Sequence, residues 1–377
     1  MRSPPLRNVL ELMRREFYAL GRDRVMLGLI VYAFSVLIYV NATATGIELR
    51  NAAIAFVDED ASTLSARLFD APQPPYFQHP QRLALADVDA ALDAGRFTFV
   101  VDVPPGFQSD VLAGRAPRLQ INVDATAMSQ AGIGANYLQQ IFSAEIDEFV
   151  RGRRQEAPQA VTQVVRIAFN PNLQMPWFMG PMMIVNSITL LSIVLTGAAL
   201  IREREQGTLE HLLVLPLTPI EIMLAKIGAT ALVIVVATTF ATVVMIHGVL
   251  SVPARGSLAL FLVAAFVYSA SIAAIGIFLA TLARSMPQLG LLSIPVVFPM
   301  AMLSGGATPL DSMPVAVQRI MQFSPSTHFT AIVQAILYRG AGFDVIWPQF
   351  LAMLAIGAVF LSIAVRRLRT TLAQAGS

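Results

Sequence analysis

The stretch Ile201-Arg-Glu-Arg-Glu-Gln-Gly-Thr-Leu-Glu-His-Leu-Leu-Val-Leu-Pro216 joins two long apolar segments of the chain. Gly207 suits the position just after a helix end, and Thr208 can cap a short new helix that a proline terminates. This helix, predicted over Leu209–Leu215, carries leucines that a solvated connecting loop does not need. Thr218-Pro219-Ile220-Glu221 then forms a capping box that begins the next apolar helix. The stretch therefore predicts a short helix across one face of a membrane, with an apolar surface for a partner.

The composition of the whole chain supports a membrane protein. Hydrophobic residues make up 55 % of its 377 residues and charged residues only 13 %, and the mean hydropathy is +0.64. Soluble proteins carry about 25 % charged residues, so this chain cannot cover a water-exposed surface. Lys226 is the only lysine and follows an alanine, which excludes a Walker A loop. The absence of cysteine excludes disulfides and thiolate sites, and the net charge of +2 gives no reason to expect nucleic acid.

Six segments without Asp, Glu, Lys or Arg are long enough to cross a bilayer, which takes about 20 apolar residues. They are Val25–Ile47, Ile167–Ile201 (with its helix expected over 179–201), Ile227–Ala254, Gly256–Ala283, Ser285–Leu310 (with its helix expected to end near Ser304) and Val345–Val365. Basic residues gather beside the ends that would share one side, so the positive-inside rule predicts that both termini are cytoplasmic. The predicted fold class is a polytopic α-helical membrane protein with six transmembrane helices, spans two to six lying within residues 178–377.

Residues 48–177, between the first two spans, have a different composition. They contain 15 acidic residues against 10 arginines, whereas the rest of the chain is net positive. Apolar and alternating runs predict four strands and two helices, separated by proline-rich turns. The strands are expected at Ala53–Val57, Phe97–Val103, Leu119–Val123 and Val161–Phe169, and the helices at Leu85–Leu92 and Met128–Arg153. This pattern predicts an α/β domain on the side opposite the termini, the periplasm in a bacterium.

The first 24 residues, ahead of the first span at 25–47, form an amphipathic pattern. One helical face collects the apolar residues Leu6, Val9, Leu10, Met13, Phe17 and Leu20, and arginines lie mainly on the other. Such a helix lies in the membrane interface against lipid. Packing on the cytoplasmic ends of the other spans is the alternative, and the two arrangements do not exclude each other.

Two motifs resemble a known family. Glu203-Arg204-Glu205-x-Gly207-Thr208-x-Glu210-x-Leu212-Leu213-x-x-Pro216 is similar to the coupling-helix signature of ABC-2 type transporter permeases. Leu303-Ser304-Gly305-Gly306-x-x-Pro309-x-x-x-Met313-Pro314, with Pro325-x-x-His328-Phe329 further on, resembles the external re-entrant region between spans five and six of that family. The large domain after the first span resembles the multidrug-export branch.

The resemblance implies the permease subunit of an ATP-driven exporter in the bacterial inner membrane, with no catalytic residues and no cofactor of its own. A separate ABC ATPase subunit would bind ATP and magnesium, and the coupling helix at about 203–216 would dock on it through Glu203, Glu205, Gly207, Thr208, Glu210, Leu212, Leu213 and Pro216. The external region, about 305–344, would be shaped by Gly305, Gly306, Pro309, Met313, Pro314, Pro325 and His328. A second permease would complete a homodimer or heterodimer. A periplasmic adaptor and an outer-membrane channel are further partners, and a drug or another amphiphile is the expected substrate.

Some polar residues and prolines within the spans have two interpretations each. Asn186 and Thr189 would line a transport path or make hydrogen bonds between helices. His247 would relay protons or extend to the outer interface, and Pro295 and Pro299 would kink the fifth span. No metal site is expected, because the histidines are isolated. An ion-coupled secondary transporter and a membrane-anchored periplasmic sensor or scaffold are the alternative functions; the first needs titratable groups at mid-membrane and a repeated half, which the sequence does not show.

Overall fold

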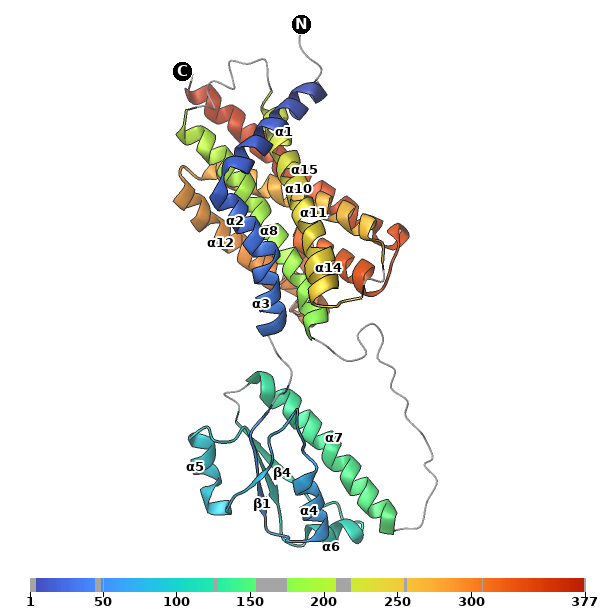
Figure 1. The fold of residues 1–377 in the computed structure, drawn as a ribbon. Coiled ribbons are helices and arrows are strands. Elements are labelled where there is room, and N and C mark those ends of the chain that lie inside the picture. The colour runs from blue at the N-terminus through green and yellow to red at the C-terminus, as the bar shows by residue number, and fades with distance from the viewer. Residues whose placement is uncertain are drawn as a thin grey trace. The chain divides into compact units, whose positions relative to one another are not determined.

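The computed structural model describes residues 5–44, 49, 51–124, 128–153, 175–207, 218–253, 256–306 and 308–375. The chain separates into two compact units. A helical unit takes in Met1–Thr45 and Ile167–Ser377, and an α/β unit takes in Gly46–Arg166. Figure 1 shows the helices and strands of both units.

The helical unit consists of long apolar helices joined by short connections. Before the α/β unit come α1 (Pro5–Arg22), α2 (Arg24–Phe34) and α3 (Val36–Ala44). After it follow α8 (Met175–Glu205), α10 (Pro219–Phe240) with its π-helical continuation η3 (Ala241–Val249), α11 (Leu258–Leu282) and α12 (Met286–Met302). The last part holds η4 (Leu310–Ser312), α13 (Val315–Met321), α14 (Pro325–Val333), the π-helical η5 (Gln334–Tyr338) and α15 (Phe343–Ala375).

Five helices among the described residues are long and apolar enough to cross a membrane. They span Arg24–Thr43, Pro176–Glu205, Pro219–Val249, Leu258–Leu282 and Phe343–Thr370. The segment predicted at 285–310 forms only the 17-residue helix α12. At about 1.5 Å per residue this helix is about 26 Å long, less than the bilayer core of about 30 Å. The predicted membrane helices are therefore found, whereas the count of six spans stays a prediction.

Helix α12 ends at Met302, close to the predicted end near Ser304, because the chain then runs into a glycine-containing loop. The backbone N–H of Leu303 still bonds the carbonyl of Pro299, but Gly305 has φ +90°, which a helix cannot accommodate. The helix of the second span, conversely, begins at Met175, earlier than the predicted residue 179. Its early proline, Pro176, occupies a first-turn position where the missing N–H costs nothing.

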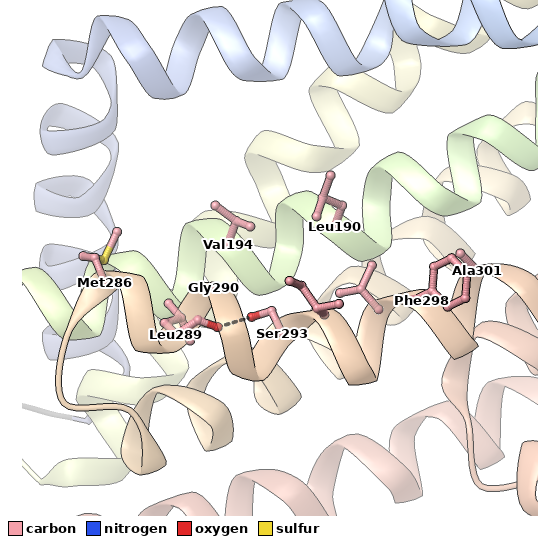
Figure 2. A pocket seen from close by; sticks show the side chains of 10 residues that line it. Leu190, Val194, Met286, Leu289, Gly290, Ser293, Phe298 and Ala301 are labelled. Carbon is pink, nitrogen blue, oxygen red and sulfur yellow. Dashed lines mark hydrogen bonds between the residues drawn. The ribbon is translucent and has the colours of Figure 1, made fainter.

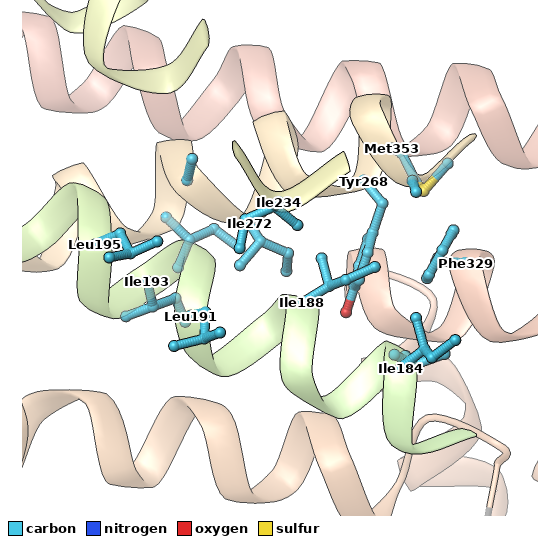
Figure 3. Packing of buried hydrophobic residues seen from close by; sticks show 14 of the residues in the cluster. Ile184, Ile188, Leu191, Ile193, Leu195, Ile234, Tyr268, Ile272, Phe329 and Met353 are labelled. Atoms are coloured by element: carbon cyan, nitrogen blue, oxygen red, sulfur yellow. The ribbon is translucent and has the colours of Figure 1, made fainter. Parts of the chain in front are cut away.

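Helix α8 lies at the centre of the helical unit. In the most apolar 18-residue stretch of this span 78 % of the residues are buried, compared with 28 % in that of the last span. Its side chains meet those of α10, α11, α14 and α15 in one apolar cluster (Figure 3). Tyr268 of α11 is fully buried there and stacks on Phe329 of α14, with ring centroids 4.2 Å apart. The core of this unit is therefore organised around α8 and α11.

The α/β unit contains a four-stranded sheet of order β2-β1-β3-β4. Its strands are β1 (Ile54–Asp58), β2 (Gln81–Arg82), β3 (Phe99–Val103) and β4 (Gln120–Val123). Strand β1 pairs in parallel with β2 and β3, and β4 is antiparallel to β3. Its helices are α4 (Thr63–Asp70), η1 (Leu85–Asp87), α5 (Val88–Asp93), α6 (Phe107–Leu112) and α7 (Met128–Arg153).

Both faces of the sheet are covered, which explains its nearly continuous apolar strands. Helices α4, α6 and α7 contribute Leu68, Phe107 and Phe142 to the same apolar cluster as Phe56 and Phe99 of the strands. Helix α5 packs on the other face, against Ala55, Val57 and Val100. On the surface, Arg67 of α4 pairs with Glu148 and Glu145 of α7, and the hydrogen bond to Glu148 in particular raises the pKa of Arg67.

The sequence predicted most of this unit. Strands β1, β3 and β4 and helix α7 lie where the patterns placed them, and α5 occupies most of the predicted helix at 85–92. Helices α4 and α6 and the two-residue strand β2 were not predicted. The strand predicted at Val161–Phe169 lies outside the described residues.

Candidate functional site

The candidate coupling site begins where α8 ends. Glu205 is the last helical residue, and Gly207 follows in the left-handed conformation with φ +67°. This conformation is typical of the residue that terminates a helix, and it favours glycine because a Cβ atom would be strained there. Glu205, Gln206 and Gly207 are exposed. Thr208, Glu210, Leu212, Leu213 and Pro216, and with them the predicted coupling helix, lie outside the described residues.

The three residues before Glu205, which we call the α8 anchor, each bind a different element. Arg202 donates from Nη1 to Asp23 Oδ2 at the junction of α1 and α2, at 2.5 Å. Glu203 Oε1 accepts from Lys226 Nζ on α10, at 2.7 Å. Arg204 Nη1 donates to the carbonyl of Ala283, just after α11, at 2.7 Å. The end of α8 is thus fixed to the junction of α1 and α2, to α10 and to the end of α11.

Asp23 has a second role beside its ion pair. It is the N-cap of α2, and its Oδ1 accepts from the backbone N–H of Met26 at 3.1 Å. This hydrogen bond, together with Arg202, holds the pKa of the Asp23 carboxyl below its ordinary value of 3.8 against the opposing effect of burial. The carboxylate is therefore charged at neutral pH and available to Arg202.

Lys226 is buried, with a side chain only 2 % exposed, and its ammonium lies between two carboxylates. Besides Glu203 it donates to Glu16 Oε1 of α1, at 2.5 Å. We call Glu16, Glu203 and Lys226 the lysine triad. The triad joins α1, α8 and α10, the last two of which flank the undescribed segment 208–217.

A second anchored point lies at the start of α10. Thr218 and Glu221 form the predicted capping box at the start of α10: Thr218 Oγ1 accepts from the backbone N–H of Glu221, whose Oε2 accepts from that of Thr218. Glu221 Oε1 also accepts from Asn8 Nδ2 of α1, at 3.2 Å. Met13 of α1 lies over Gly228 of α10, where a Cβ atom would come within 3.0 Å of its methyl carbon. Helix α1 therefore contacts the start of α10, where the chain leaves segment 208–217.

This arrangement refines the amphipathic pattern of the N-terminal helix. Of the residues predicted to share one face, Val9, Met13 and Leu20 are partly buried, whereas Leu6, Leu10 and Phe17 are exposed. Helix α1 packs against α10 with one side and leaves an apolar stripe beside it open. Packing on the spans is therefore part of the helix's role, and an interfacial position of the exposed stripe stays a prediction.

An apolar groove of about 430 Å³ lies between α8 and α12. Figure 2 shows Leu190 and Val194 of α8 facing it opposite Leu289 and Phe298 of α12. The groove contains one hydroxyl, that of Ser293, which is already bonded to the carbonyl of Leu289. Phe298 and Ile294 are more than 60 % exposed, so α12 offers an apolar surface that the described residues do not cover.

Of the residues suggested for a transport path, Asn186, Pro295 and Pro299 lie near the groove, whereas Thr189 and His247 form hydrogen bonds with other residues. Thr189 is buried and bonds Tyr268 of α11 at 2.5 Å, so it makes the interhelical hydrogen bond that was the alternative interpretation. Asn186 is half-buried, one helical turn before Leu190 of the groove. Pro295 and Pro299 lie inside α12, beside groove residues. His247 is in the π-helical η3, with its Nδ1 2.6 Å from the carbonyl of Val252.

The predicted external region forms a compact set of turns and short helices. Gly305 is in the left-handed conformation and its carbonyl accepts from Gln334 at 3.4 Å, while Gly306 is buried near Met182 of α8. Pro309 precedes η4, Met313 and Pro314 precede α13, and Met313's carbonyl accepts from Gln318. Pro325 begins α14, where His328 bonds the carbonyl of Gln322 at 2.8 Å. These contacts hold the connection between α12 and α15 in shape.

Several residues of the site were missed by the sequence-based prediction. Arg202, Asp23, Glu16 and Lys226 were given no role at the coupling site, although Lys226 was noted as the only lysine. A signal was present: this lysine stands five residues after the capping-box Glu221, in an otherwise apolar helix where a charge requires a partner. The partner itself, 210 residues away, could not be read from the sequence.

Comparisons with known proteins agree with this architecture. The family model described as ABC-2 family transporter protein matches residues 25–366. The chain is 51 % identical to the Inner membrane transport permease YhhJ of Escherichia coli K12 over 367 residues, which cover 97 % of this chain and 98 % of that protein. It is 31 % identical over 351 residues to the E. coli K12 protein named Probable multidrug ABC transporter permease YbhR, covering 92 % and 94 % of the two chains. The apolar helices and these relatives make the chain a multi-pass membrane protein and a transport permease.

Proposed function

Since the chain belongs to the ABC-2 transporter family, we propose that it is the membrane-spanning subunit of an ATP-driven exporter, coupled to a separate ATPase through residues 203–216. In this proposal the partner binds ATP and magnesium, and this chain needs no cofactor. We place the chain in the bacterial inner membrane, because the relative YhhJ is named an inner membrane transport permease. The ends of α8, α10 and α15 that carry Arg202, Arg204, Lys226 and Arg366 face the cytoplasm, in keeping with the positive-inside rule.

The α8 anchor is the observation that carries the proposal. Three consecutive side chains fix the helix end to the start of α2, to α10 and to the end of α11, immediately before the segment 208–217. A connecting loop without a function has no need of such fixation at both ends. A partner that pushes on this segment would act on four membrane helices at once, which is what a transport cycle driven from the cytoplasm requires.

The groove between α8 and α12 supports a hydrophobic or amphiphilic substrate. Its lining is apolar, and the relative YbhR is named a multidrug permease. A second permease, either another copy of this chain or a similar one, would cover the exposed face of α12 and enclose the groove. Asn186, at the edge of this surface, would then give a polar contact within a path that is otherwise apolar.

The proposal is tested by purifying the chain in mild detergent and measuring which ATPase co-purifies and in what ratio. Glu205→Lys and Glu210→Lys reverse a charge at the predicted interface, where like charges cost several kcal/mol, and Leu213→Asp places a charge in an apolar contact. We expect all three variants to reach the membrane in normal amounts and to lose the ATPase or its substrate-stimulated hydrolysis. Asp147→Lys, the same reversal on the exposed surface of α7, is the matched control.

Two results would refute the proposed function. One is a wild-type chain that purifies without a stoichiometric ATPase from cells that produce both. The other is full ATPase binding and full stimulated hydrolysis in all three coupling variants, which would make the segment an ordinary loop.

A further inference from the structure

The lysine triad is an unusual way to attach an N-terminal helix. Lys226 carries the only ammonium side chain of the protein and is nearly inaccessible to solvent. Its two carboxylate partners come from helices on either side, Glu16 from α1 and Glu203 from α8. Burying charge is unfavourable unless partners compensate it, so the three side chains are stable only while α1, α8 and α10 keep this arrangement.

The surroundings of the triad are tight. A cavity of about 30 Å³, enough for roughly one water molecule, lies beside it and is lined by Glu16, Arg202 and Thr230 among others. On α1, the contacts of Asn8 with Glu221 and of Met13 with Gly228 lie on the same side as Glu16. Helix α1 is thus attached along three turns to α10, and through Lys226 also to α8.

The lysine triad differs from an ordinary ion pair of α1 in its burial and in the helices that it joins. Arg7 and Glu11 also form a salt bridge in α1, at 3.1 Å, but both side chains are about two-thirds exposed or more and they join nothing beyond their own helix. The triad, in contrast, links the two helices that leave and enter the coupling segment. Without the ammonium of Lys226, two half-buried carboxylates would repel each other and α1 would lose its link to α8.

We propose that Lys226 is a positioning residue of the transport cycle: through Glu16 and Glu203 it makes α1, α8 and α10 move as one body when the coupling segment moves. The inference rests on the proposed function, because it requires an ATPase that acts on this segment. Lys226 contacts neither nucleotide nor substrate in this scheme. It determines how much of the ATPase's movement reaches the groove between α8 and α12.

The test measures that transmission without knowledge of the substrate. The chain has no native cysteine, so Ile294→Cys places a single maleimide-reactive group on the exposed groove side of α12. The readout is the ratio of labelling rates with and without ATP and vanadate, in the complex with its ATPase. Lys226→Met removes the charge at similar length, Lys226→Arg retains it, and Glu16→Gln weakens only the bond to α1. Arg7→Met on the exposed pair is the matched control.

We expect nucleotide to change the labelling ratio about tenfold in the otherwise unmodified chain, a typical coupling between two sites. In Lys226→Met the ratio should fall close to one while the ATPase stays bound and continues to hydrolyse ATP. Glu16→Gln should lie between, Lys226→Arg should recover most of the response, and Arg7→Met should stay within about twofold of the parent, as for an exposed pair.

The outcomes separate the two proposals. If Lys226→Met retains the full nucleotide response, or if it loses the ATPase altogether, Lys226 does not transmit movement and the inference is wrong. If Lys226→Met does not accumulate in the membrane, Glu16→Gln decides in the same way, since it leaves the contact between Lys226 and Glu203 in place. A parent complex that binds no ATPase, or whose labelling ignores nucleotide, refutes the proposed function instead.

Discussion

The two faces of helix α8 differ in how closely they pack against their neighbours. Toward α11 the helix is closely packed: Gly276 allows the two backbones to approach, and the hydroxyl pairs Thr189–Tyr268 and Ser192–Ser269 bridge them at 2.5 and 2.8 Å. Toward α12 the same helix borders an apolar groove of about 430 Å³.

The difference lies in the kind of contact that each face makes: hydrogen bonds and close backbone packing toward α11, and an apolar groove toward α12. Small residues and interhelical hydrogen bonds are typical of permanent contacts in membranes, where apolar side chains gain little by leaving lipid for protein. Between α8 and α12, both of which the structure describes, no side-chain hydrogen bond joins the two helices, and Phe298 on this side is exposed. The contact of α8 with α11 is therefore the more closely bonded of the two.

The largest effect is expected from filling the close contact. In Gly276→Ala the new Cβ would lie 2.9 Å from Ile193 Cα and 3.0 Å from its carbonyl oxygen. Because backbone atoms cannot move aside as a flexible side chain can, the free energy of unfolding should fall by about 1–3 kcal/mol, seen as a lower melting temperature in detergent. Gly290→Ala on α12 is the control, since its Cβ would meet nothing within 4 Å. Equal melting of the two variants would show that the two faces are packed alike.

A smaller effect should come from the buried hydroxyl pair. Thr189 donates its only hydroxyl hydrogen to the carbonyl of Val185, so Tyr268 must donate to Thr189. Tyr268→Phe retains the stacking on Phe329 and should cost about 0.5–1.5 kcal/mol. Thr189→Val leaves the tyrosine O–H buried without an acceptor and should cost more, up to about 3 kcal/mol. Thermal melting of both variants checks the order; the reverse order would mean that Tyr268 finds another acceptor.

The smallest effect concerns Asp23, where the end of α8 is fixed to the junction of α1 and α2. The folded state lowers the pKa of Asp23, so its charge adds stability above the ordinary pKa of 3.8, and this contribution is lost as the pH falls through the lower folded value. Asp23→Asn keeps a capping side chain but loses the charge that attracts Arg202. We expect a loss below about 1 kcal/mol near neutral pH that begins to shrink below about pH 4 and is gone once the pH lies below the lowered folded pKa of Asp23. A difference between the two proteins that stays constant down to pH 3 would contradict this assignment.

Local sequence patterns predicted the elements well. The span-length apolar runs, the capping box at Thr218 and Glu221, the helix end at Gly207 and the helix at 128–153 all depend on residues within a few positions of one another. Hydrophobic periodicity, capping hydrogen bonds and the conformational freedom of glycine act over this range, so one sequence suffices to find them. The short helices α4 and α6 were missed because six to eight residues give too little periodicity.

The sequence by itself determined that this chain is a membrane protein with an inserted α/β unit, and it predicted a coupling motif at 203–216. Only the tertiary structure decided which side of α8 is fixed, that Thr189 bonds another helix, and that Glu203 points to Lys226. Lys226 meets Glu16 across 210 positions and Arg202 meets Asp23 across 179. Such pairs depend on how whole helices pack, and the packing of helices sums many weak contacts over the complete bundle. The charges at residues 202–204 are visible in the sequence, but the residues with which they pair depend on how the helices pack.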